Sequence, residues 1–103
     1  MLIEFLSFEG CPHAPILRQR LDEALQELGW LTLTPFPLDL EQLFQAKDCR
    51  SGFGSPTILV DGVDLFGAQT PLAMGDPACR IYRPNLPTSA DLIARLRQRT
   101  ARS

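Results

Sequence analysis

The decisive stretch of this chain is FEGCPHA, residues 8–14. An apolar run at residues 2–8 comes first and predicts a buried strand. An amphipathic pattern follows at residues 14–28 and predicts a helix that ends at Gly29. The stretch therefore places one thiol, that of Cys11, between a strand and the start of a helix.

Length and composition indicate a single domain. The chain has 103 residues, of which 45% are hydrophobic, so it can bury one modest core. No apolar run approaches the roughly 20 residues that span a bilayer, and no basic leader precedes the first strand. We therefore expect a cytoplasmic protein without a membrane partner. In that reducing compartment, the three cysteines are expected to be free, catalytic or metal-binding.

The charge is unevenly distributed although the formal net charge is only −2. After Cys79 the chain carries a single acid, Asp91, and six arginines, at positions 80, 83, 95, 97, 99 and 102. We expect these arginines to form a solvated helix face, with contact to an anionic ligand as the alternative. No aromatic residues interleave with them for base stacking, so nucleic acid is not an expected partner.

The middle of the chain predicts an edge strand followed by a short helix. Residues 30–38 carry Pro35 and Pro37, which exclude a central strand. Asp39 is placed to cap the short helix. Residues 49–55 then predict a loop.

The second half predicts a hairpin, a long connection and a final helix. Strands at residues 57–60 and 63–66 flank Asp61-Gly62, a strong hairpin signal. The connection at residues 67–87 has four prolines and no period, and long loops of this kind are often functional. A capping-box pattern at residues 88–91 begins the helix, which we expect to fray from Thr100.

This order, strand-helix-strand-helix-strand-strand-helix, resembles the thioredoxin fold in its minimal, glutaredoxin-sized form. The resemblance implies an α/β domain over residues 1–103 with a mixed four-stranded sheet in the order 2-1-3-4. It also implies an antiparallel third strand and helices on both faces. Residues 67–87 are an insertion before the last helix.

Cys11 is the candidate nucleophile. Only a thiolate reacts, and the free amides and positive dipole of a helix start favour the anion. His13, the only histidine, adds positive charge nearby when protonated. Gly10 permits a tight turn that leaves the thiol accessible, whereas Glu9 opposes the anion if it faces the sulfur. The alternatives are a buried, inert Cys11 and a His13 without a chemical role.

Cys11-Pro12-His13 resembles the start of the Cys-Pro-His-Cys motif of disulfide-oxidase members of the thioredoxin superfamily. Ala14 stands where the second cysteine would be, so a local dithiol cannot form. Three roles for Cys11 remain open. It exchanges alone with glutathione or a protein disulfide, as in monothiol relatives; it is resolved by a distant cysteine; or it binds a soft metal.

The stretch GSPT, residues 54–57, carries a second resemblance. Pro56 resembles the cis-proline that faces the active site throughout the superfamily. That resemblance implies that Ser55 and Pro56, together with Pro12, contact the substrate. An ordinary trans proline at the start of a strand is the alternative.

The expected topology brings the 67–87 segment back to the edge that holds Cys11. Cys79 is thus the candidate resolving thiol, or a ligand of a shared metal, and a loop anchor is the alternative. Arg80 is a candidate to stabilise a thiolate or hold an anionic ligand. Cys49 is a second candidate partner. Without a Cys-x-x-Cys pair no structural zinc site is expected.

Three motifs together, FEGCP at 8–12, GSPT at 54–57 and CRIY at 79–82, resemble a bacterial group of short thioredoxin-like proteins. Members are sometimes labelled alkylmercury-lyase-like, which implies soft-metal chemistry. Carbon–mercury cleavage is not expected, because no proton-donating acid beside paired thiolates is identifiable.

The sequence therefore predicts a thiol–disulfide oxidoreductase that acts through mixed disulfides. A glutathione or thioredoxin system would supply electrons, and no bound organic cofactor is implied. Two other functions stay open. One is a mercury- or copper(I)-binding protein that uses Cys11 and Cys79, and the other is an inactive adaptor that docks a partner at Ser55 and Pro56.

Overall fold

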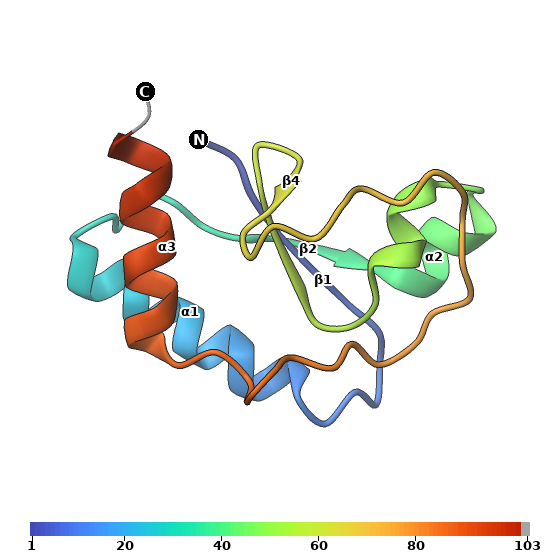
Figure 1. Cartoon of the computed structure of the whole chain (residues 1–103), viewed down its shortest axis with the longest axis horizontal. Helices are drawn as coiled ribbons and strands as arrows, with labels where there is room; N and C mark the ends of the chain where they lie inside the picture. The colour runs from blue at the N-terminus through green and yellow to red at the C-terminus, as the bar shows by residue number, and fades with distance from the viewer. Residues whose placement is uncertain (102–103) are drawn as a thin grey trace.

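A computed structural model describes residues 1–101 of the chain and shows an α/β architecture with a four-stranded sheet (Figure 1). The strands are β1 (Ile3–Ser7), β2 (Phe36–Asp39), β3 (Thr57–Val60) and β4 (Val63–Asp64). Their order is β2-β1-β3-β4. β2 runs parallel to β1, whereas β3 is antiparallel to β1 and β4. The predicted sheet order and the antiparallel third strand are therefore confirmed.

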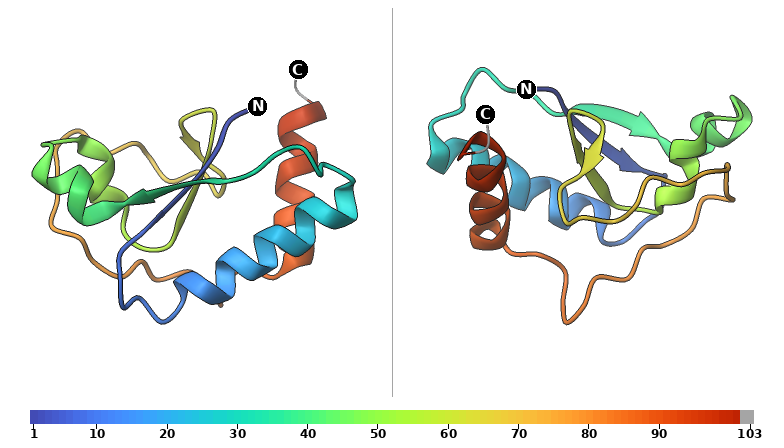
Figure 2. Two further views of the ribbon diagram at one scale, coloured as in Figure 1. Left: turned by 180° about the vertical axis from the view of Figure 1, so that it is seen from behind. Right: turned by 45° about the horizontal axis from the view of Figure 1, so that its top comes forward.

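Helices cover both faces of this sheet. The helical elements are α1 (Ala14–Leu28), α2 (Leu40–Gln45), the 3₁₀ helix η1 (Cys49–Phe53) and α3 (Ser89–Ala101). Figure 2 shows α1 and α3 together on one side, with α2 on the other. Among the described residues no helix is both long and apolar enough to cross a membrane.

Alternation along the central strands explains this layering. Successive side chains of a strand point to opposite faces of the sheet. Ile3 and Phe5 of β1 pack with Leu17, Leu92 and other residues of α1 and α3. Leu6 of β1 joins the cluster formed by α2 and η1 on the opposite face.

The signals for turns and caps are also confirmed. The side chain of Asp39 accepts a hydrogen bond from the amide of Glu41 at the start of α2. At the start of α3, Thr88 and Asp91 exchange reciprocal hydrogen bonds of 3.0 and 3.2 Å. Each of these bonds satisfies a backbone amide at the start of a helix, which is why such short local patterns are informative.

Three predicted boundaries are wrong, each for a local reason. Residues 30–35 are not strand, because the Trp30 amide bonds to Leu25 at the end of α1 and the chain turns again before β2. β4 stops at Asp64. The Asp64 carboxylate accepts hydrogen bonds from the amides of Phe66 and Ala68, and these bonds turn the chain out of the sheet. The expected loop at residues 49–55 contains η1, capped by the side chain of Asp48.

Residues 67–87, called the strap from here on, contain no helix and no strand of the sheet. In Figure 1 the strap leaves β4, passes the α2 end of the molecule and returns along the loop before α1 to reach α3. Its one bridge of β type joins Cys79 to Ser55, in parallel orientation.

The chain is expected to fray from Thr100, but Thr100 is still part of α3. Residues 102–103, including Arg102 of the predicted basic face, lie outside the described part of the chain.

Candidate thiol site

Cys11 lies in a tight turn between β1 and α1. Its amide donates to the Phe8 carbonyl over 3.2 Å, and its own carbonyl accepts from the Ala14 amide over 3.3 Å. His13 is the N-cap of α1 but makes no side-chain capping bond, and a proline, Pro15, occupies the first turn. The helix therefore begins after both Pro12 and His13, as the amphipathic pattern at residues 14–28 predicts. Cys11 still lies within three residues of the helix start.

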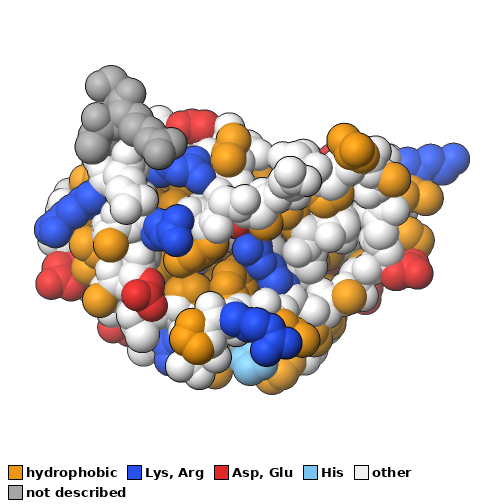
Figure 3. Space-filling view, in the orientation of Figure 1, with side chains coloured by type: hydrophobic (Ala, Val, Ile, Leu, Met, Phe, Trp, Pro, Cys, Tyr) orange, Lys and Arg blue, Asp and Glu red, His pale blue; other side chains and the backbone are white. Residues whose placement is uncertain are grey.

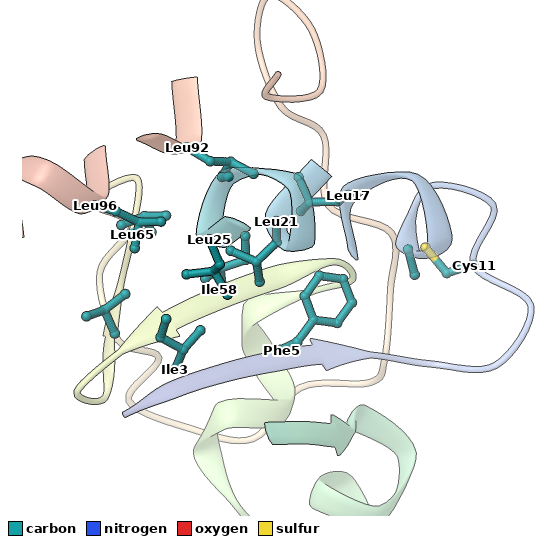
Figure 4. Packing of buried hydrophobic residues seen from close by; sticks show 13 residues of the cluster. Ile3, Phe5, Cys11, Leu17, Leu21, Leu25, Ile58, Leu65, Leu92 and Leu96 are labelled. Carbon is teal, nitrogen blue, oxygen red and sulfur yellow. The ribbon is translucent and has the colours of Figure 1, made fainter. Parts of the chain in front are cut away.

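The Cys11 side chain is buried, and the expected accessible thiol is a wrong prediction. Only 4% of the residue is exposed, and it belongs to the apolar cluster between the sheet and α1. Figure 4 shows Cys11 at one end of that cluster, beyond Phe5 and Leu17. Gly10 does adopt a positive φ of 90°, but the resulting turn directs the next side chain inward. Any chemistry of this sulfur must proceed from a largely apolar environment.

The Ser55-Pro56 peptide bond is cis, as predicted. Both backbone groups of Ser55 are paired with the strap. Its amide donates to the Ala78 carbonyl, and its carbonyl accepts from the Arg80 amide, both over 2.8 Å. Ser55 therefore does contact an extended chain segment, but that segment is the protein's own. The buried Ser55 hydroxyl has no hydrogen-bond partner among the described residues.

Arg80 fastens the strap to the sheet. Its guanidinium donates two bonds to Asp64, of 2.5 and 3.1 Å, and a third to the hydroxyl of Thr57. It also lies 4.4 Å from the centre of the Tyr82 ring, while the Tyr82 hydroxyl donates to the Pro56 carbonyl over 2.7 Å. The sequence predicts that Arg80 stabilises a thiolate or an anionic ligand. In the structure its guanidinium is already paired with the carboxylate of Asp64, whose side chain is 0% exposed.

The environment of this anchor shifts two pKa values. Burial acts to lower the pKa of Arg80, but the hydrogen bond that Arg80 donates to Asp64 and the neighbouring charges outweigh it and raise the pKa. Burial raises the pKa of Tyr82 from 10.0 to about 12, against the opposing charge of Arg80. Arg80 is thus a cation and Tyr82 a neutral hydrogen-bond donor across the physiological range.

A pocket of about 200 Å³ brings four of the predicted site residues together. Pro12 and His13 line one part of it, and Cys79 and Arg80 line another. Cys79 is exposed, whereas Cys49 is half-buried and does not line this pocket. All three cysteines are free thiols. The geometry thus joins Cys79, rather than Cys49, to the turn that carries Cys11.

A second hollow of about 440 Å³ adjoins this pocket, because Arg80, Ile81 and Tyr82 line both. Arg83 and Arg95 also line it, and basic side chains are visible around the hollow in Figure 3. The expectation of a solvated arginine face is wrong for Arg80, which is paired with Asp64, and for the half-buried Arg99, which donates to the carbonyls of Val60 and Asp64. Arg95 is exposed, and its guanidinium lies 5.2 Å from the centre of the Phe66 ring.

Sequence reasoning missed Asp64, which holds Arg80 and with it the strap beside the cis-proline. Asp64 looks like an ordinary polar position in a hairpin strand, and nothing local indicates that its partner lies sixteen residues later. The sequence does suggest that Ile81 and Tyr82 pack the strap against the body; Tyr82 bonds to the Pro56 carbonyl, whereas Ile81 is 74% exposed. A signal did exist for the strap, since the glycines at 52 and 54 permit close approach of another backbone.

Comparison with known proteins finds no matching family model, no similar curated protein and no similar solved structure. Within residues 1–101, no three side chains of His, Cys, Asp or Glu gather in a way that could hold a metal ion. The chemistry of the site is therefore inferred from its own residues, which are two thiols, one imidazole and the bend at Ser55 and Pro56.

Proposed function

We propose that this protein has the thioredoxin fold and catalyses thiol–disulfide exchange with Cys11 and Cys79. One observation carries the proposal. The exposed Cys79 shares a pocket with Pro12 and His13, the two residues that directly follow Cys11, at the point where the strap pairs with Ser55. The sheet order and the cis bond before Pro56 support the fold assignment.

The sequence predicts Cys11 as the nucleophile and Cys79 as the resolving thiol, but exposure favours the reverse. The exposed Cys79 meets the substrate, and the buried Cys11 resolves the intermediate. The Cys79 thiolate attacks one sulfur of a disulfide, forms a mixed disulfide and releases one substrate thiolate, which takes up a proton. The Cys11 thiolate then attacks the Cys79 sulfur and releases the second substrate thiol. The protein is oxidised by two electrons to a Cys11–Cys79 disulfide, which glutathione or a thioredoxin system reduces again.

His13 is the ionisable partner of this chemistry. Its side chain is exposed and lines the pocket with Cys79, so a protonated imidazole there favours a nearby thiolate. The neighbouring Arg80 is already paired with Asp64 and serves to position Cys79 on the strap. We assign the substrate-facing charge to His13 for this reason.

Mild oxidation tests the proposal. Treatment with diamide should remove two hydrogens from the monomer, and peptide mapping should join Cys11 to Cys79. The Cys49→Ser variant should lose the same two hydrogens, whereas Cys11→Ser and Cys79→Ser should not. A disulfide that contains Cys49, or no intramolecular disulfide at all, would contradict the assignment. If titration with Hg(II) or Cu(I) instead gives a protein that retains its thiols and binds one metal ion, soft-metal binding is favoured.

A further inference from the structure

We propose that residues 78–80 of the strap occupy the backbone position at which an extended polypeptide would bind beside Ser55, so that the thiol site accepts small disulfides and excludes polypeptide ones. This inference rests on the proposed function and specifies its substrate class. It concerns the form of the substrate, whereas the proposed function concerns the reaction.

The first step of the argument is backbone pairing. An extended peptide binds a protein edge by pairing with free amide and carbonyl groups. Here both groups of Ser55 are already used, each at 2.8 Å, by Ala78 and Arg80. The pairing has the parallel geometry of an added strand. A polypeptide substrate could take this position only after both bonds had broken.

Anchors that follow the bridge along the chain keep these residues in place. Arg80 is fixed to the fully buried Asp64, so moving the strap outward would leave that carboxylate without its counter-charge. Tyr82 bonds to the carbonyl of Pro56. Further along, the Arg20 side chain of α1 donates to the carbonyls of Leu86 and Pro87. The strap is thus held by the sheet and by α1.

The first half of the strap lies directly against η1. A Cβ atom built on Gly52 would come 3.0 Å from the Cβ of Pro71 and 3.3 Å from the carbonyl of Ala73. The amide of Gly75 donates to the hydroxyl of Ser51 over 3.1 Å. A side chain at position 52 would therefore push the strap away, which makes Gly52→Ala a wedge that changes no residue of the thiol site.

The pocket that Cys79 lines has a volume of about 200 Å³, and Cys79 does not line the adjoining hollow of about 440 Å³. Pockets for drug-sized ligands run from roughly 300 to 1,000 Å³, so this space suits a small disulfide. Because Cys79 itself is exposed, such a molecule can reach the sulfur while the strap stays in place.

Two disulfides distinguish the substrate classes. The reduced protein is reacted with 2-hydroxyethyl disulfide and, separately, with insulin, and each second-order rate constant is measured. The variants are Gly52→Ala and Arg20→Met, which loosen the strap from opposite ends and change no residue that lines the pocket beside Cys79. Leu72→Ala is the matched control, because Leu72 is a strap residue that is 99% exposed. Hydrogen exchange at the amides of Ser55 and Arg80 reports strap docking independently of any activity.

In the wild-type protein we expect both amides to be protected and 2-hydroxyethyl disulfide to react. Each loosening variant should exchange these amides faster and react with insulin about tenfold faster, the factor expected for losing about one hydrogen bond. The rate constant with 2-hydroxyethyl disulfide should stay within about twofold of the wild-type value, which is a small change on the scale where 1.4 kcal/mol corresponds to a factor of ten. Leu72→Ala should match the wild type in all three measurements.

Three results would overturn the inference. Rapid exchange of the Ser55 and Arg80 amides in the wild type would show that the strap does not occupy the edge. Faster exchange in the variants without faster insulin reduction would show that the strap does not control access. A wild-type protein that reacts with neither disulfide would end the proposed function, and this inference with it, whereas the first two results leave the proposed function standing.

Discussion

The chain contains two Cys-Arg pairs, Cys49-Arg50 and Cys79-Arg80, and the structure uses them differently. Arg50 pairs with Asp48, two residues away, and with Glu4 of β1, and its side chain is 35% exposed. Arg80 reaches back sixteen residues to Asp64, with exposures of 15% and 0% for the two side chains.

This difference shows that surroundings decide what an arginine does for stability. A solvent-exposed ion pair contributes about 0–1 kcal/mol, because water screens the charges. A buried carboxylate depends on its partner, since removing that partner leaves a charge without solvation. Cys49 is therefore next to a local cap of η1, whereas Cys79 is next to the residue that fixes the strap.

The largest effect should come from removing the arginine of each pair. Arg80→Met leaves Asp64 buried and unpaired, and we expect the free energy of unfolding to fall by about 3–5 kcal/mol. Arg50→Met should cost less, because water still reaches the side chains of Arg50 and Asp48, which are 35% and 30% exposed, although Glu4, at 12%, also loses its partner. Urea denaturation followed by circular dichroism measures both, and equal losses would break the comparison.

A second variant checks the cause of that loss. Asp64→Asn keeps an acceptor for the amides of Phe66 and Ala68 but removes the charge. Combined with Arg80→Met, it should restore part of the lost stability, because no unpaired charge remains. A double variant less stable than Arg80→Met would show that the lost packing of Arg80, rather than the charge on Asp64, dominates.

Tyr82 gives the next largest effect. As the only tyrosine, it should titrate at about 12 in absorbance at alkaline pH, compared with 10.0 for an exposed phenol. Because the folded pKa is raised, the associated stability is fully present below pH 10 and is lost as the pH rises towards about 12. A midpoint near 10 in the folded protein would mean that the strap leaves the phenol in water.

Alkylation compares the cysteines of the two pairs directly. Cys79 is exposed and Cys49 half-buried, so we expect iodoacetamide to modify Cys79 about tenfold faster, with the buried Cys11 slowest. Peptide mass spectrometry at increasing reaction times gives the three rates. Fast labelling of Cys11 would instead assign the first attack on substrate to that residue.

The smallest effect concerns Asp48. Its hydrogen bonds from the Arg50 side chain and amide lower the pKa of Asp48, so its contribution is present above about pH 4 and is lost as the pH falls further. Asp48→Asn keeps the cap of η1 but removes the charge, and should cost less than about 1 kcal/mol at pH 7. The difference from the wild type should shrink as the pH falls below the ordinary carboxyl value of 3.8, as measured by denaturation at decreasing pH.

Local signals account for most of what the sequence predicted correctly. Asp39, the Asp61-Gly62 turn and the box at residues 88–91 act within a few residues of themselves, so their patterns suffice. The strand order was implied by the resemblance of the element order to the thioredoxin fold, and the sheet has that order. Long-range contacts account for the failures. The burial of Cys11 depends on packing against α1, and the engagement of Arg80 depends on Asp64, neither of which a local pattern records.

The sheet also ends in an unusual way at its two margins. β2 carries Pro37, which has no amide hydrogen to donate, and β4 is only two residues long before Asp64 turns the chain aside. Exposed strands with free amides act as templates for fibril-like stacking of identical molecules, and proteins often blunt them with proline or by shortening them. Both devices are present here, so the features that end the sheet also protect the protein against self-aggregation at high concentration.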